Sequence, residues 1–163
     1  MSEPEAAVNA VELRHVTKTF PGVVALKDVS FDIPRATVHA VCGENGAGKS
    51  TLIKIISGVY ADGTFDGELY VNGEQARLSS IKDGERLGIA TIYQELSLFN
   101  KLSVAENIFT ENMATRWGLI DWDQMMKQTR ELLDELELFE VDPDQTIDSL
   151  GIGQQQLVEI ARA

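Results

Sequence analysis

Hydrophobic and polar residues alternate near the start of the chain, and this pattern predicts short β-strands. Alternation over residues 11–16 indicates one strand, and residues 29–33, just before Pro34, indicate another. Within residues 67–74, the dipeptide Asn72-Gly73 is typical of a two-residue hairpin turn. Short alternating strands joined in this way predict an antiparallel sheet.

Two apolar runs without alternation predict strands of another kind. Residues 38–42 and residues 89–93 are such runs, and they are typical of strands buried on both faces. A helix is predicted near residues 80–87, ending at Gly88. Cys42, the single cysteine, excludes an internal disulfide, fits a reducing cytoplasm and is expected to pack in the core.

The second half of the chain has helical periodicity. The sequence Ser-Val-Ala-Glu at residues 103–106 is a capping box, which predicts the start of a helix. Asp121 is expected to cap the next helix, where apolar residues recur every three or four positions over residues 122–136. That apolar stripe is typical of a packed core face. A last helix is predicted from Gly153 to the end of the sequence.

Composition and charge narrow the function classes. With 163 residues and 44% hydrophobic content, the chain is long enough for one domain with a core. The net charge of −12 argues against a nucleic-acid partner and against direct adhesion to anionic lipid. No apolar run approaches the length of a membrane span, and residues 1–9 are expected to be a flexible leader.

The strongest chemical signal is the pattern Gly-x-x-x-x-Gly-Lys-Ser at residues 43–50. Small residues allow successive backbone N–H groups to curl around phosphates, and the start of the following helix adds a positive dipole end. Lys49 can reach the β- and γ-phosphates, and the Ser50 hydroxyl can bind Mg²⁺. The motif predicts nucleotide binding; the alternative is a glycine-rich turn that binds nothing. The predicted nucleotide contacts are Gly43, Glu44, Asn45, Gly46, Ala47, Gly48, Lys49, Ser50 and Thr51.

Three more segments lie at characteristic distances from this loop. Phe20 precedes the loop, Gln94 follows an apolar run, and residues 150–156 open the last helix. In this order they resemble the adenine-stacking aromatic, the Q-loop and the signature motif of ABC transporter ATPases. Residues 104–109 and 153–161 are most similar to the sugar-importer branch, the ribose-, xylose- and galactoside-type ATP-binding subunits.

The resemblance implies an α/β phosphate-loop NTPase fold of the ABC ATPase type, with an antiparallel β subdomain and an α-helical subdomain. It implies ATP and Mg²⁺ as cofactors, Lys49 and Gln94 as catalytic residues, and Ser50 and Gln94 as metal ligands. Phe20 would stack on adenine. Gly151, Gly153 and Gln154 would face the γ-phosphate of a second, head-to-tail ABC domain or subunit. The plainer alternatives are a core position for Phe20, a solvated loop for Gln94 and a polar helix start for Gln154.

The resemblance also divides the chain. After the leader, residues 10–163 are expected to form an incomplete ABC ATPase domain, truncated before the Walker B strand. Residues 10–95 would hold the β subdomain and nucleotide-binding core, residues 96–149 the helical subdomain, and residues 150–163 the signature motif and its helix. The strand ending in Asp-Glu is missing, so the catalytic Glu is absent, and Glu44, Glu95 and Glu159 stand at other motif positions.

The function implied is ATP-driven uptake of a monosaccharide. The helical subdomain would dock a membrane permease, with a periplasmic or extracellular sugar-binding protein involved indirectly and no nucleic acid. The subunit would be cytoplasmic and peripheral at the inner face of the cell membrane. Without the catalytic Glu, the chain alone is expected to bind ATP with little or no hydrolysis. The alternatives are a non-catalytic nucleotide-binding or interaction fragment, a soluble non-transport ABC protein and, least favoured, a small-molecule kinase.

Overall fold

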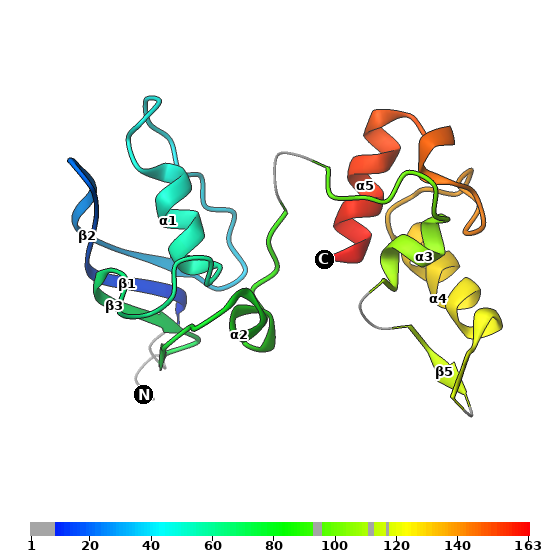
Figure 1. Cartoon of the computed structure of the whole chain (residues 1–163), viewed down its shortest axis with the longest axis horizontal. Helices are drawn as coiled ribbons and strands as arrows, with labels where there is room; N and C mark the ends of the chain where they lie inside the picture. The colour runs from blue at the N-terminus through cyan, green and yellow to red at the C-terminus, as the bar shows by residue number, and fades with distance from the viewer. Residues whose placement is uncertain (1–8, 93–95, 111–112, 117) are drawn as a thin grey trace, which may run out of the picture. The chain divides into compact units, whose positions relative to one another are not determined.

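The computed structural model describes residues 9–92, 96–110, 113–116 and 118–163 (Figure 1). The chain divides into two compact units, Met1–Ala90 and Thr91–Ala163. The N-terminal unit contains a β-sheet with helices, and the C-terminal unit is mainly helical.

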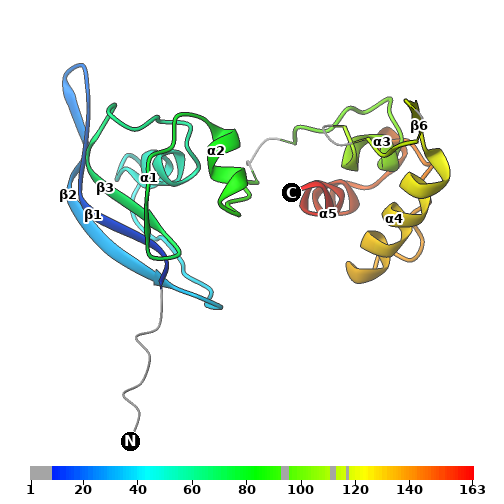
Figure 2. The same ribbon diagram turned by 90° about the horizontal axis from the view of Figure 1, so that it is seen from below.

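An antiparallel sheet forms the frame of the N-terminal unit, as the alternating pattern predicts. Its strands are β1 (Asn9–Phe20), β2 (Val23–Pro34), β3 (Asp66–Val71) and β4 (Glu74–Ala76), in the order β2-β1-β3-β4. Figure 2 shows β1 and β2 running side by side. Asn72 and Gly73 join β3 to β4 with φ of 54° and 86°, which suits a two-residue hairpin turn. The predicted hairpin is confirmed.

Strand β1 contains an irregularity that simple alternation does not predict. Its pairing shifts between Leu13 and Val16 on the β2 side and between Arg14 and Thr17 on the β3 side, and His15 has a φ of 54°. Such a bulge inserts an extra residue and changes which positions face inward. Leu13 lies on the buried side before the bulge, and Val16 and Lys18 lie there after it. The bulge therefore brings a lysine into the interior of this unit.

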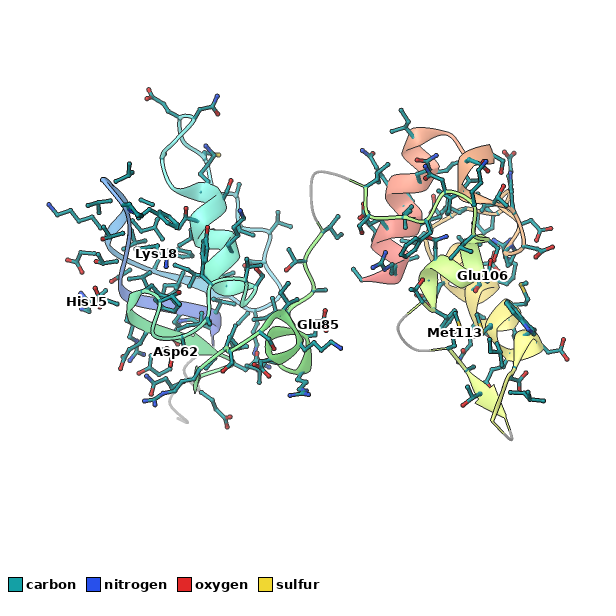
Figure 3. The ribbon with its side chains drawn as sticks, viewed as in Figure 1. His15, Lys18, Asp62, Glu85, Glu106 and Met113 are labelled. Atoms are coloured by element: carbon teal, nitrogen blue, oxygen red, sulfur yellow. The ribbon has the colours of Figure 1, made fainter. Side chains whose placement is uncertain are left out.

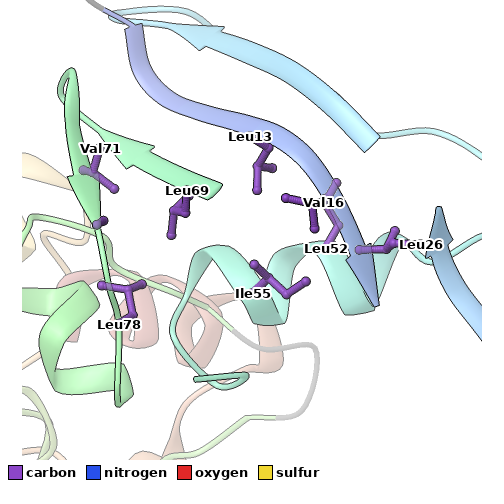
Figure 4. Close-up of a cluster of buried hydrophobic side chains, with 9 residues drawn as sticks. Leu13, Val16, Leu26, Leu52, Ile55, Leu69, Val71 and Leu78 are labelled. Carbon is purple, nitrogen blue, oxygen red and sulfur yellow. The ribbon is translucent and has the colours of Figure 1, made fainter. Parts of the chain in front are cut away.

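Helix α1 (Lys49–Ile56) packs against this sheet. Leu52 and Ile55 face the strands from α1, at the spacing that the sequence predicts for its apolar side (Figure 4). The buried cluster consists of Leu13, Val16, Leu26, Leu52, Ile55, Leu69, Val71, Ala76 and Leu78. Helix α2 (Ile81–Arg86) begins after Ser80 and ends just before Gly88, so the predicted helix is confirmed.

The two strands predicted from continuous apolar runs are wrong in the part of the chain that the structure describes. Residues 37–42 and 89–92 have no strand assignment, and Tyr93 lies outside the described residues. Val38, Val41 and Ile92 are exposed, and so is Cys42, which we expected in the core. A strand buried on both faces needs hydrogen-bonded neighbours, and no described strand pairs with either run.

The described part of the C-terminal unit consists of three helices, a short β-hairpin and a 3₁₀ turn. Its elements are α3 (Val104–Ile108), β5 (Thr115–Arg116), β6 (Leu119–Ile120), α4 (Trp122–Glu135), the 3₁₀ turn η1 (Ile147–Ser149) and α5 (Ile152–Arg162). Both predicted caps are confirmed: Ser103 and Glu106 form a capping box, and the Asp121 carboxylate accepts from the Gln124 N–H. The β5–β6 hairpin and η1 were not predicted. Each described helix is too short or too polar to cross a membrane.

Polar groups hold the interior of the C-terminal unit together. Asn107 is fully buried; its Oδ1 accepts from the Phe99 N–H at 2.7 Å, and its Nδ2 donates to the Ser103 carbonyl at 2.9 Å. Glu159 of α5, only 6% exposed, accepts from the backbone N–H and hydroxyl of Ser97 at 3.0 and 2.8 Å. These contacts hold residues 97–99 against helices α3 and α5.

Substitution of Asn107 tests this polar interior. We expect Asn107→Ala to lower the free energy of unfolding by about 2–4 kcal/mol, because buried backbone groups lose their partners. Asn100→Ala, which removes an exposed carboxamide nearby, is the matched control and should have almost no effect. Urea denaturation followed by circular dichroism measures both. Equal stability of the two variants would contradict the role assigned to Asn107.

Candidate nucleotide-binding site

The glycine-rich loop at residues 43–48 curls around the side chain of Lys49. The Lys49 ammonium donates to the carbonyl oxygens of Gly43 and Glu44, at 2.7 and 2.8 Å. The Ala47 N–H donates to the Glu44 carbonyl at 3.2 Å and closes a turn inside the loop. An ammonium has three donors, so these two contacts keep the cation at the loop while leaving capacity for an anion.

Close packing against β2 determines where the loop meets helix α1. Gly48, the N-cap, has a φ of 89°. A Cβ atom there would lie 2.4 Å from the Ala25 carbonyl oxygen and 2.8 Å from a methyl carbon of Leu26. Only glycine combines this backbone conformation with such an approach. Both the close packing against β2 and the positive φ therefore require glycine at position 48.

The start of helix α1 suits an anion. Gly48 has no side chain to cap the helix, and the first turn of α1 contains no acidic residue. The first N–H groups of a helix lack intrahelical partners and lie at its positive dipole end. Together with the Lys49 ammonium, they are the donors that a phosphate chain requires. The residues present therefore fit the triphosphate of a nucleotide.

A magnesium ion fits the same site only if the nucleotide phosphates supply some of its oxygen ligands. Ser50, exposed in the first turn of α1, can supply one hydroxyl oxygen. Among the described residues, no group of three or more His, Cys, Asp or Glu side chains is placed to hold a metal. Mg²⁺ commonly binds through a few protein oxygens and substrate phosphates, and a lone hydroxyl is consistent with that arrangement.

Phe20, the residue predicted to stack on adenine, is the last residue of β1 and is half-buried. Its ring meets the Tyr60 ring edge-on, with centroids 5.6 Å apart and an interplanar angle of 61°. The Lys18 ammonium lies over the Phe20 ring, 5.2 Å from the centroid. Phe20 thus has aromatic and cationic neighbours, and Lys18 and Tyr60 were not predicted. The inward position of Lys18 follows from the bulge in β1.

The remaining predicted site residues belong to the C-terminal unit. Gly151 is the N-cap of α5, and its N–H donates to the Gln154 side-chain oxygen at 3.0 Å. Gly153 is exposed in the first turn of the same helix. Gln94 lies outside the described residues. The structure thus brings residues 43–51 together in one loop and helix start, and it places the three signature residues at the start of another helix.

A glycine-rich loop around a lysine, followed by a helix with a free N-terminus, defines the phosphate-loop class of nucleotide-binding proteins. Residues 26–163 match the model of the ABC transporter family. The chain therefore belongs to this family, whose ATP-binding domains have the α/β ABC ATPase fold expected from the sequence.

Curated relatives resemble the chain over most of its length. It is 54% identical over 153 residues to a xylose import ATP-binding protein of Moorella thermoacetica, and 50% identical over 153 residues to an L-arabinose transport ATP-binding protein of Geobacillus stearothermophilus. Each alignment covers 94% of this chain and 30% of the relative. The chain thus spans less than a third of the length of these proteins.

Solved structures have the same fold. One ATP-binding cassette of an ABC transporter has a TM-score of 0.80 at 25% identity, covering 95% of this chain and 64% of that one. A part of an ABC transporter complex from Clostridium perfringens has a TM-score of 0.75 at 24% identity, covering 94% and 60%. This likeness supports the fold, and the predicted ABC ATPase fold class is confirmed.

Gly48→Ala tests the packing of the loop against β2. We expect it to abolish binding of Mg-ATP and to destabilise the chain by more than the ~1–2 kcal/mol that a positive φ alone costs, because its Cβ meets backbone atoms. Gly63→Ala is the matched control, since Gly63 has a φ of 81° and open space around it. Isothermal calorimetry and thermal unfolding measure both variants. Retained nucleotide binding in Gly48→Ala would contradict this account.

Proposed function

We propose that this chain is the ATP-binding part of an importer subunit that couples ATP binding and hydrolysis to uptake of a monosaccharide through a membrane permease. The proposal of nucleotide binding rests on one observation: the glycine-rich loop curls around Lys49 at the start of α1, which has no side-chain cap. The relatives are named for import of xylose and transport of L-arabinose, and this supports the proposal that the substrate is a sugar. Because the chain spans 30% of those relatives, the activity of a whole subunit is part of the proposal.

The proposed roles of the site residues are those that the family resemblance implies. Residues 43–51 bind the phosphates, with Lys49 at the β- and γ-phosphates and Ser50 as a Mg²⁺ ligand, while Phe20 stacks on adenine. Bound Mg²⁺ would neutralise charge on the phosphate oxygens. Gln94 is proposed as a second metal ligand and γ-phosphate sensor. Gly151, Gly153 and Gln154 are proposed to meet the nucleotide of a head-to-tail partner domain.

A second candidate function is nucleotide binding without turnover, and one contact favours it for these 163 residues. Glu159 is the acidic residue of helix α5, and its carboxylate is buried and held by Ser97. A general base must be within reach of the attacking water, and Glu159 is only 6% exposed. We propose that the chain alone binds ATP with little or no hydrolysis. Sustained phosphate release by the purified chain would contradict this.

The proposed partners follow from the importer function. The helical residues 96–149 would dock the permease, a second ABC domain or subunit would complete the paired nucleotide sites, and a sugar-binding protein outside the membrane would deliver the substrate. The proposed location is cytoplasmic, at the inner face of the membrane. A net charge of −12 is compatible with a protein partner at that surface and unfavourable for anionic lipid itself.

Lys49→Ala tests the proposed phosphate contact. We expect Mg-ATP binding to weaken by about ten- to a hundredfold, because a hydrogen bond to a charged group contributes ~1.5–3 kcal/mol. Lys82→Ala removes an exposed lysine from α2 and is the matched control, expected to bind like wild type. Calorimetric titration of each purified chain gives the affinities. Equal affinity of Lys49→Ala and wild type would refute nucleotide binding at this loop.

Gly151→Ser tests the proposed trans contact of the signature helix, where the family pattern has serine. Gly151 has φ −64° and ψ 153°, and a Cβ there would meet only the Gln154 side-chain oxygen, at 3.7 Å. Serine therefore fits, and its hydroxyl is a new donor for a phosphate. We expect the full-length subunit, assembled with its permease, to hydrolyse ATP about tenfold faster.

Gly151→Ala is the control for that experiment, because alanine has the same backbone requirement and no hydroxyl. We expect its ATPase rate to stay at the level of the glycine form. Steady-state phosphate release measures all three proteins. A rate for Gly151→Ser no higher than for Gly151→Ala would show that the hydroxyl does not serve this contact.

A further inference from the structure

Lys18 is a buried cation in the N-terminal unit, where Ser57 is the other buried polar residue among those that the structure describes. The residue is 7% exposed, and its side chain lies on the inward side of β1 (Figure 3). The ammonium donates to the carbonyl oxygen of Thr64. None of the ion pairs found among the described residues includes Lys18. A buried ammonium is costly unless other groups replace the water it loses, so its surroundings call for an explanation.

Two aromatic rings surround this ammonium. The Lys18 nitrogen lies 4.9 Å from the centroid of the Tyr60 ring and 5.2 Å from that of Phe20. A lysine within about 6 Å of a ring face is attracted by the negative charge density of that face. The two rings also contact each other edge-on. Lys18 therefore contacts both rings, and each of the three side chains contacts the other two. A second ammonium, that of Lys54, lies 6.0 Å from the centroid of the Tyr60 ring.

The cluster of Lys18, Phe20 and Tyr60 links the proposed adenine contact to the helix that follows the phosphate loop. Phe20 ends β1, and Tyr60 follows helix α1, which begins with Lys49 at the phosphate loop. The Tyr60 N–H donates to the carbonyl of Lys54, in the last turn of α1, at 3.0 Å. The position of the Phe20 ring is thereby linked, through Tyr60 and α1, to the position of the loop.

We propose that Lys18 and Tyr60 are positioning residues that hold Phe20 as the base-stacking platform at a set place relative to the phosphate loop. The inference rests on the proposed ATP-binding function. Neither residue needs to touch the nucleotide, because both act through the Phe20 ring. The cation lies over one face of that ring, and stacking with a base would use the other face. Loss of Lys18 then affects recognition of the base and leaves recognition of the phosphates intact.

The experiment compares a complete nucleotide with its phosphate part. Calorimetry on the 163-residue chain gives dissociation constants for Mg-ATP and for Mg-tripolyphosphate. We expect Lys18→Met to weaken Mg-ATP binding about five- to thirtyfold and to leave tripolyphosphate binding unchanged. Lys18→Arg should recover most of the ATP affinity, since a guanidinium keeps the charge and stacks on aromatic rings. Lys27→Met, at an exposed position of β2, is the matched control.

A double-mutant cycle tests whether Lys18 acts through Phe20. In a Phe20→Ala background, we expect Lys18→Met to cause no further loss of ATP affinity. Tyr60→Leu, which keeps apolar volume and removes the ring, should weaken ATP selectively as Lys18→Met does. This variant also decides the question if Lys18→Met does not fold, as judged by circular dichroism.

The outcomes separate this inference from the proposed function. Equal losses for ATP and tripolyphosphate, or additive losses in the cycle, would overturn the positioning role. The positioning role is also overturned if Phe20→Ala weakens ATP binding while the Lys18 and Tyr60 variants do not. The proposed function would stand in that case. If Phe20→Ala binds ATP like wild type, the base platform itself is refuted. A wild-type chain that binds neither ligand would refute nucleotide binding at the loop, and the inference with it.

Discussion

The packing of helix α1 against the antiparallel sheet is the constraint on which the rest of the N-terminal unit depends. Leu52 and Ile55 bury the apolar side of the helix on β1 and its neighbours. At the helix start, the backbone of Gly48 approaches the backbone of β2 more closely than any side chain would permit. These contacts leave the helix little freedom to shift, so the loop before it keeps the shape that positions its donors.

Lys18 and Lys49 of the N-terminal unit carry the same charge in different surroundings, and different roles are proposed for them. Lys49 is held by backbone carbonyls of a loop, where an incoming phosphate can compete for its donors. Lys18 is buried beside two aromatic rings and a backbone carbonyl, and its proposed role is to position those rings. The chain has a net charge of −12, and its overall field is unfavourable for an anion. The proposed anion site therefore depends on local donors, the Lys49 ammonium and the start of α1.

Local signals in the sequence predicted local structure well. The Asn72-Gly73 turn, the capping box at Ser103 and the cap at Asp121 each depend on neighbouring residues, and each is present. The strands predicted at residues 38–42 and 89–93 failed over the described residues, because a strand needs partners that hydrophobicity alone does not reveal. The β5–β6 hairpin was missed because strands of two residues are too short to show alternation.

By itself, the sequence determined the Gly-x-x-x-x-Gly-Lys-Ser motif, the helix that follows it and the family, since each depends on residues close together in the chain. Only the tertiary structure decided that Gly48 meets β2 and that Lys18 contacts the rings of Phe20 and Tyr60. These contacts join residues distant in sequence, and a bulge in β1 turns Lys18 inward. Bulges and long-range packing depend on the whole arrangement of strands, which no short pattern of residues encodes.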